Sequence, residues 1–164
     1  MQITINPYDK KSINAAIKKL TEYKKRIAEK EAEMVQRLSM LGASVASLGF
    51  SRAIYNGEND VNIHVELNGN IATIYAEGEA VGFIEFGSGA RYGSGHPQNG
   101  EFGVGPGTWS MGAEGKGHWD NPKGWWYGSG EHSYGNPPAM AMYNATQTMV
   151  EQIAQIAREV WSSD

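Results

Sequence analysis

Apolar residues recur at helical spacing along the first third of the chain. Beyond Pro7, with Asp9 or Ser12 as N-cap, they follow steps of three and four from Ile13 to Val45, while Lys and Glu occupy the other positions. This spacing predicts one long helix over residues 9–48, ended by a left-handed glycine just after it. At 1.5 Å per residue the helix is roughly 60 Å long, so we expect part of it to project from a small domain.

Strict alternation replaces the helical pattern in the next segment. Apolar residues from Val61 to Leu67 alternate with polar ones, and a second β-like run extends from Ile71 to Ala76. The Asn68-Gly69-Asn70 sequence between the runs tolerates the positive φ angles of a tight turn. The pattern therefore predicts an antiparallel hairpin over residues 60–77.

The last segment returns to helical spacing. Pro137 and Pro138 suit a first helical turn, and apolar residues then recur from Met142 to Val160. We predict a C-terminal helix over residues 138–161 that lies across the hairpin and buries its apolar face. Together these segments predict a single α+β domain spanning residues 1–164.

The segment between hairpin and last helix is rich in glycine and aromatic residues. Residues 87–135 hold 15 of the 21 glycines and four of the five tryptophans. Disordered segments are poor in aromatics, and a loop this long is usually functional, so we predict an inserted arm over residues 87–136 with β-hairpin structure near Thr108–Met111 and Gly124–Tyr127. Its expected contacts with partner subunits are Tyr92, Phe102, Trp109, Trp119, Trp125, Trp126 and Tyr127.

Composition excludes several classes of function. The chain has 164 residues, a formal net charge of −4 and no cysteine, so disulfides, thiolate catalysis and Cys-based zinc sites are excluded. No basic excess points to nucleic-acid binding. No secretory signal pattern is visible, and no apolar run approaches the ~20 residues that span a bilayer, so we expect no membrane contact.

Candidate chemistry is sparse. The sequence lacks a nucleophile elbow and a phosphate-binding loop, and we predict no catalytic residue. His96, His118 and His132 share the arm with several carboxylates, but zinc ligands normally come in closer pairs. We expect no metal or cofactor, and we expect these histidines to bond to backbone groups. Two alternatives stay open: a metal-dependent hydrolase, and a carbohydrate-binding module that stacks sugars on the arm tryptophans.

Two segments resemble a known family. Ala80–Gly89 is similar to the Y-x-x-F-V-E-F-G-T-G signature of the lambdoid phage minor tail-component family, also described as neck or tail-completion proteins. Residues 135–145 are similar to the Pro-Ala element that leads into that family's last helix. The chain departs from the pattern at Ser88, where the family has threonine, and at Asn136, where it often has arginine. The signature positions are Phe83, Glu85, Phe86, Gly87, Gly89, Pro137, Pro138 and Ala139.

The resemblance implies a structural subunit of the phage head–tail junction. Such subunits form a ring, of six or twelve copies, between the connector or head-closure proteins and the tail-tube or tail-terminator proteins. The chain would be assembled in the host cytoplasm, would reside in the virion, and would let DNA pass without specific binding. A tail-terminator ring is an alternative within the same class.

Ring assembly also makes a physical demand that the sequence can meet. Head-to-tail contacts need two different complementary surfaces on each subunit. The projecting helix and the aromatic arm are the candidates. The basic cluster from Lys18 to Arg26 is then either a solvated face or a docking face for an acidic partner.

Overall fold

The computed structural model describes residues 3–89, 91–92, 95–98, 116–117, 123–126 and 131–162. The elements in chain order are α1 (Lys10–Ser51), β1 (Asn62–Asn68), β2 (Ile71–Glu77), α2 (Val81–Phe86), β3 (Lys116–Gly117), β4 (Trp125–Trp126), β5 (His132–Ser133) and α4 (Ala141–Ser162). The predicted α+β fold, with its long first helix, hairpin and packed last helix, is confirmed. Most of the predicted arm lies outside the described residues.

The start of α1 follows the predicted capping. The Asp9 carboxylate accepts a hydrogen bond from the Lys11 N–H at 2.9 Å, which satisfies one free donor of the first turn. Ser12, the other candidate cap, instead accepts from the Asn6 N–H at 2.8 Å and holds the preceding segment. Within the described part of the chain, neither α1 nor any other helix is long and apolar enough to cross a membrane.

The end of α1 differs from the prediction. The helix runs through Gly49 to Ser51. Phe50 is therefore a helical residue, and its side chain is buried in the core. Gly49 has a packing role there, because a Cβ on it would lie 2.7 Å from the Cβ of Ala141 in α4. The last carbonyls are capped from elsewhere: the side-chain amide of Asn59 donates to the Phe50 carbonyl at 2.9 Å.

β1 and β2 pair in the predicted antiparallel register, from Asn62 opposite Glu77 to Asn68 opposite Ile71. Gly69 has a φ of 63°, as expected for the first central residue of a type II′ turn. Residues that face each other across the ladder share one side of the ribbon, so Val65 with Ile74 and Leu67 with Ala72 form its apolar face.

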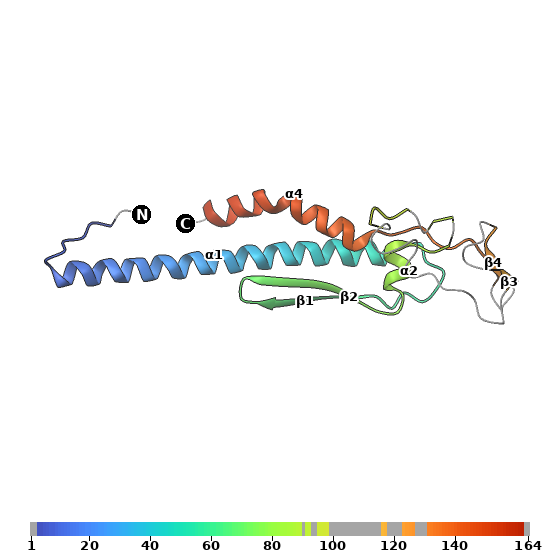
Figure 1. Cartoon of the computed structure of the whole chain (residues 1–164), viewed down its shortest axis with the longest axis horizontal. Helices are drawn as coiled ribbons and strands as arrows, with labels where there is room; N and C mark the ends of the chain where they lie inside the picture. Colours follow the sequence, from blue (N-terminus) through green and yellow to red (C-terminus); the bar gives the residue numbers. More distant parts are fainter. Residues whose placement is uncertain are drawn as a thin grey trace.

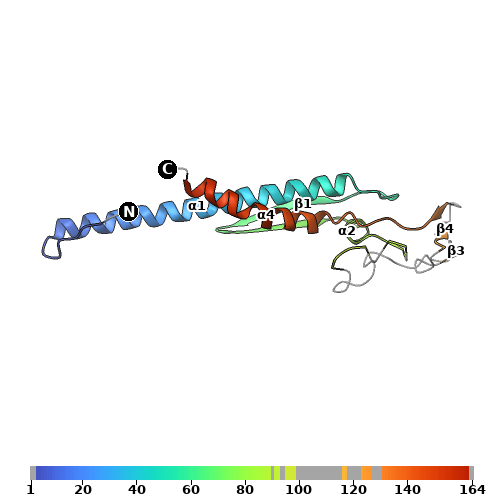
Figure 2. The ribbon, with the colours of Figure 1, turned by 90° about the horizontal axis from the view of Figure 1, so that it is seen from above.

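The helix α4 and the two hairpin strands β1 and β2 pack along the second half of α1. Figure 1 shows α4 on one side of α1 and the hairpin on the other, and Figure 2 shows α4 running beside α1 over the hairpin. α4 and β2 both approach α1 at Gly42. A Cβ on this glycine would lie 2.5 Å from Met149 Sδ of α4 and 2.7 Å from Ile74 Cδ1 of β2. The first half of α1 extends beyond both neighbours (Figure 1), which confirms that part of the helix projects.

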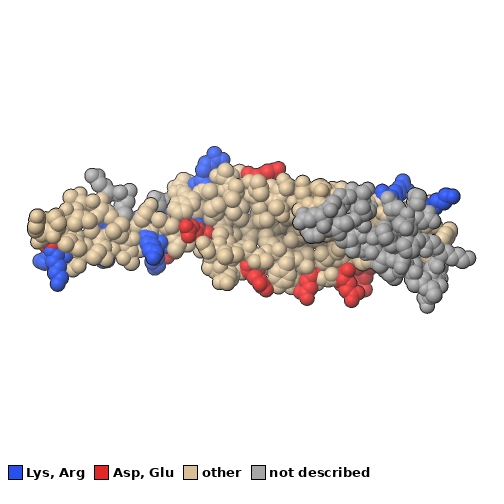
Figure 3. All heavy atoms as spheres, viewed as in Figure 1, with Lys and Arg blue, Asp and Glu red and all other residues tan. Residues whose placement is uncertain are grey.

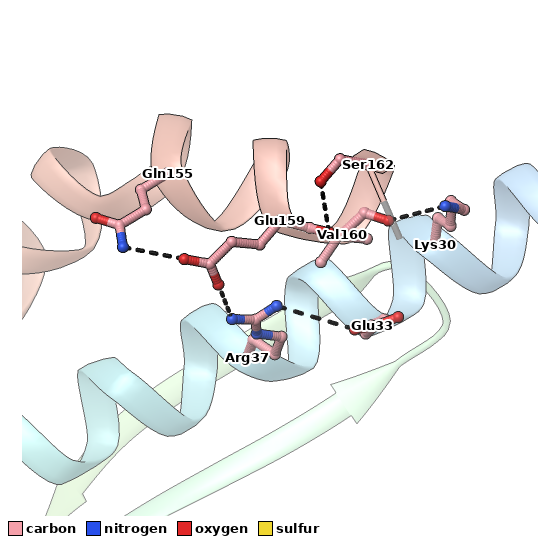
Figure 4. A network of polar contacts seen from close by, with 7 residues as sticks. All are labelled: Lys30, Glu33, Arg37, Gln155, Glu159, Val160 and Ser162. Carbon is pink, nitrogen blue, oxygen red and sulfur yellow. Dashed lines mark hydrogen bonds and ion pairs between the residues drawn. The ribbon is translucent and has the colours of Figure 1, made fainter. Parts of the chain in front are cut away.

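A polar network holds the last turns of α4 to the middle of α1 (Figure 4). Arg37 forms an ion pair with Glu159, and Lys30 donates to the Val160 carbonyl at 2.9 Å. A hydrogen bond from the Gln155 amide and the nearby Arg37 guanidinium lower the pKa of Glu159 below its ordinary value. The contacts set where α4 ends along α1, and α1 continues toward its N-terminus without this cover.

Candidate functional site

The two segments that carry the family resemblance meet in the structure. α2 and the turn after it run alongside residues 136–140, with backbone N–H groups donating from Ser88 to Asn136 at 3.0 Å and from Ala139 to Ile84 at 2.8 Å. We call residues 83–89 and 136–143 the α2–α4 joint. All eight signature positions lie within it.

Glu85 is the centre of the joint. Its side chain is buried, with the residue 4% exposed, and its two oxygens accept hydrogen bonds from the N–H groups of Met142 and Tyr143, both at 3.0 Å. These N–H groups belong to the first turn of α4, where helices leave donors unpaired and favour negative charge. Glu85 therefore caps a helix that begins more than fifty residues later in the chain.

The start of α4 corrects the predicted boundary at residue 138. The helix begins at Ala141, because the N–H groups of residues 139 and 140 donate to carbonyls of α2 instead of continuing a helix. Met140 has a φ of 52°, a left-handed conformation that is uncommon for a residue with a side chain. Its carbonyl accepts the first helical hydrogen bond, from Asn144 at 2.8 Å, while its own N–H donates to Glu85 O at 3.2 Å.

Ser88 and Asn136, two of the positions that differ from the resembled pattern, contact each other. The Ser88 hydroxyl donates to Asn136 Oδ1 and accepts from the Asn136 N–H at 3.2 Å. The Asn136 side-chain amide also donates to the Phe83 carbonyl at 2.7 Å. Gly87 permits this close approach: its φ is 76°, and a Cβ there would lie 2.8 Å from the Asn136 carbonyl oxygen. Ser88 and Asn136 thus form one polar contact.

His96 packs against the joint, and both of its ring nitrogens have partners. Its Nδ1 accepts from the Gln98 N–H at 3.0 Å, so Nε2 carries the proton and faces Glu85 Oε1 at 3.4 Å. The ring packs on Phe86, with centroids 4.4 Å apart, and against the edge of Tyr143. His96 bonds to a backbone group as predicted, and it also contacts a buried carboxylate that spacing alone could not identify.

Of the other two arm histidines, the structure describes one. His132 lies in β5, where its Nε2 is 2.9 Å from the Lys123 carbonyl, and His118 lies outside the described residues. Across the stretches that the structure covers, no group of three His, Asp or Glu side chains is arranged to hold a metal.

Only three of the seven predicted interface aromatics are among the described residues. Trp125 and Trp126 form β4, the middle strand of the small sheet, and Trp126 is 48% exposed with its ring against the ring of His132. Tyr92 is half-buried under the Arg91 guanidinium, which also lies over the ring of Tyr134. Phe102, Trp109, Trp119 and Tyr127 lie outside the described residues, as does the expected strand near Thr108–Met111.

Sequence reasoning did not identify a second surface, an open apolar groove of about 320 Å³. α1 forms its floor, β2 one wall and α4 the other. Its lining includes Val35, Leu38, Ala72, Ile74, Ala145 and Met149. The helical and strand periods predicted which face of each element is apolar, but the gap between those faces depends on how the three elements pack.

Searches of known protein families, curated proteins and solved structures find no match for this chain. The family resemblance therefore rests on the residues of the α2–α4 joint themselves.

Proposed function

We propose that this chain is a non-catalytic structural subunit that assembles into a ring at the head–tail junction of a tailed bacteriophage. The observation that carries the proposal is the uneven cover of α1. One apolar face runs along the whole helix. α4 and the hairpin cover only its second half (Figure 1). Soluble monomers rarely leave a continuous apolar surface bare, and such surfaces commonly mark interfaces.

The α2–α4 joint supports the same proposal. A family signature without catalytic chemistry needs a structural reason, and the joint supplies one. The Glu85 carboxylate holds the first turn of α4, and Gly87 lets the Asn136 backbone approach closely. These contacts set the direction of α4 relative to α2, and a ring subunit needs that rigidity because an angular error repeats at every copy.

The Glu85–His96 pair supports a structural role over an enzymatic one. A general acid or base must present an available proton or lone pair to a substrate. Both oxygens of Glu85 already accept backbone N–H groups, and His96 Nδ1 accepts from Gln98. Both side chains are also buried, so the pair serves the joint.

Native mass spectrometry of the purified chain, alone and mixed with head-closure and tail-tube proteins, tests the proposal. We expect a closed assembly with a single copy number, and electron microscopy should show it as a ring. A chain that remains monomeric at micromolar concentration, with and without these partners, would overturn the proposed function.

A further inference from the structure

The projecting half of α1, residues 10–28, carries an apolar stripe whose large side chains are exposed, although Ala16 beside them is buried. Ile17 and Leu20 are 55% and 51% exposed, and they continue the helical face that reaches Val35 and Leu38 in the floor of the groove. In the second half of α1 this face lies under α4 and the hairpin. The exposed members of the stripe are Ile13, Ile17, Leu20 and Tyr23.

The groove is an apolar surface without a polar recognition group. Its two hydroxyls are both used locally: Ser39 donates to the Gln36 carbonyl at 2.9 Å and Thr146 to the Met142 carbonyl at 3.0 Å. Small-molecule sites normally add a few free polar groups that orient the ligand. The apolar face extends past the groove to Leu67, which pairs with Ala72 and is 55% exposed. The surface therefore suits the apolar side of a helix.

The stripe and the groove lie among residues of opposite charge, which makes the two surfaces complementary. The projecting half holds seven Lys or Arg residues and one Glu, whereas residues 58–79, which include the hairpin, hold five acidic residues and no Lys or Arg. On the face shown in Figure 3, Lys and Arg lie over the projecting end of α1, and Asp and Glu follow the edge where the hairpin lies. Opposite potentials of this kind orient an encounter and accelerate it.

We propose that the projecting half of one copy docks into the groove of a second copy, with Ile17 and Leu20 as anchors between α4 and the hairpin. This inference rests on the proposed ring function and specifies the subunit contact. Amphipathic helices commonly bind apolar grooves through residues spaced by three, four and seven. The occupant is a second copy because one chain presents both the basic apolar helix and the acidic apolar groove.

The contact cannot form within one chain. Ile17 lies 18 residues before Val35 in the same continuous helix, a separation of about 27 Å along the axis. The two surfaces of a copy therefore remain available for two different neighbours. This is the heterologous arrangement that generates rings when the rotation closes.

Cysteine cross-linking tests the docking against a clean background, since the chain has no cysteine. Ile17→Cys chains mixed with Leu67→Cys chains should form a disulfide between copies, seen on non-reducing gels and identified by mass spectrometry. Ile17→Cys mixed with Met40→Cys is the matched control, because Met40 is 64% exposed on the opposite face of α1. We expect roughly tenfold more product from the first pair, since docking holds its thiols at millimolar effective concentration.

A second pair, Leu20→Cys with Ala72→Cys, tests the neighbouring turn, so a small error in register cannot hide the contact. Equal or absent product for both pairs, in chains that still assemble like the wild type, overturns the docking and leaves the ring function standing. A double variant carrying Ile17→Cys and Leu67→Cys separates the two proposals. A covalent ladder that ends at the ring number supports both, whereas linkage that stops at two copies supports the docking and overturns the ring.

Discussion

At the residue scale, Glu85 explains why a structural joint would favour an acidic residue. A buried carboxylate is costly unless its oxygens are bonded, and here backbone N–H groups of α4 satisfy both of them. The same N–H groups are the positive end of the helix dipole, which favours a negative charge. The cost of burying the charge and the cost of an uncapped helix are thus offset by one contact.

Removing that carboxylate should destabilise the fold. Glu85→Ala leaves the partly buried Met142 and Tyr143 N–H groups without this acceptor, so we expect a loss of about 2–3 kcal/mol in the free energy of unfolding. Urea denaturation measures the loss. Glu79→Ala, an exposed acidic residue beside α2, is the control and should change stability by less than about 0.5 kcal/mol. Equal midpoints for the two variants would show that Glu85 does not act as a cap.

Asp60 should make part of the stability depend on pH. Its carboxylate accepts from the Ala80 N–H at 2.9 Å and the Glu79 N–H at 2.6 Å, and these bonds lower its pKa below the ordinary value of 3.8. The folded-state pKa is the lower one, so the contribution is present above about pH 4 and is lost as pH falls through that folded pKa.

Asp60→Asn keeps an acceptor oxygen but cannot titrate. Between about pH 5 and pH 3 the urea midpoint of the wild type should therefore fall further than that of the variant. Glu159, whose pKa is also lowered, titrates in both proteins, so the difference between them isolates Asp60. Parallel pH profiles would contradict the assignment.

At the element scale, the crossing of α1 and α4 depends on the absence of a side chain. Gly49→Ala places a Cβ 2.7 Å from the Cβ of Ala141, which pushes the two helices apart. We expect the melting temperature to fall, with a cost of about 1–3 kcal/mol, although alanine is the better helix former. Ser47→Ala, exposed in the same turn, is the control and should leave stability unchanged or slightly raised. A higher melting temperature for both variants would show that α1 and α4 do not make their close contact at Gly49.

Periodicity was sufficient to predict the elements but not where they end. The 3.6 and 2.0 periods located α1, the hairpin and α4, because those periods reflect which face is buried. The sequence predicts a helix end at Gly49, since glycine commonly ends helices, but its role depends on Ala141, far away in the sequence. The local pattern also predicts a start of α4 at residue 138, because it does not show that residues 139 and 140 donate to carbonyls of α2.

The candidate site was predictable only in part. The signature positions and the apolar stripe of α1 are visible in the sequence. The caps that Asn59, Asp60 and Glu85 provide are not, because each side chain satisfies backbone groups of an element that is remote in sequence. The groove forms between three packed elements, so it cannot be predicted from any single segment.

At the scale of the whole molecule, the arm tryptophans predict a difference between folding and assembly. Replacing Trp125 and Trp126 with alanine should impair assembly more than it lowers the melting temperature, because interface tryptophans typically cost about 2 kcal/mol or more when truncated. Trp126 is 48% exposed in the single chain, so its loss removes little core. Mass photometry and thermal melts measure the two effects, and normal assembly by the double variant would contradict an interface role.

Charge reversal gives the last prediction, because docking between copies needs opposite signs on two different surfaces. One variant changes four lysines to glutamate and leaves the projecting half of α1 with three Lys or Arg and five Glu; the four are Lys18, Lys19, Lys24 and Lys25. The other changes three glutamates to lysine and leaves residues 58–79 with two acidic residues and three Lys; the three are Glu58, Glu66 and Glu77. Each variant alone therefore opposes like charges at its contact, so we expect assembly to weaken at about 0.15 M salt, where the Debye length is about 8 Å.

Mixing the two variants should restore assembly. In an alternating ring, the acidic helix of one variant meets the basic hairpin of the other, and the next contact pairs two unaltered surfaces. Six or twelve copies allow this alternation to close without a mismatched contact, whereas an odd ring does not. Glu151→Lys with Arg158→Glu, exposed on α4, is the matched control and should assemble alone. If mass photometry shows no recovery on mixing, the helix and the hairpin of neighbouring copies do not meet, and the bare stripe of α1 requires a different partner.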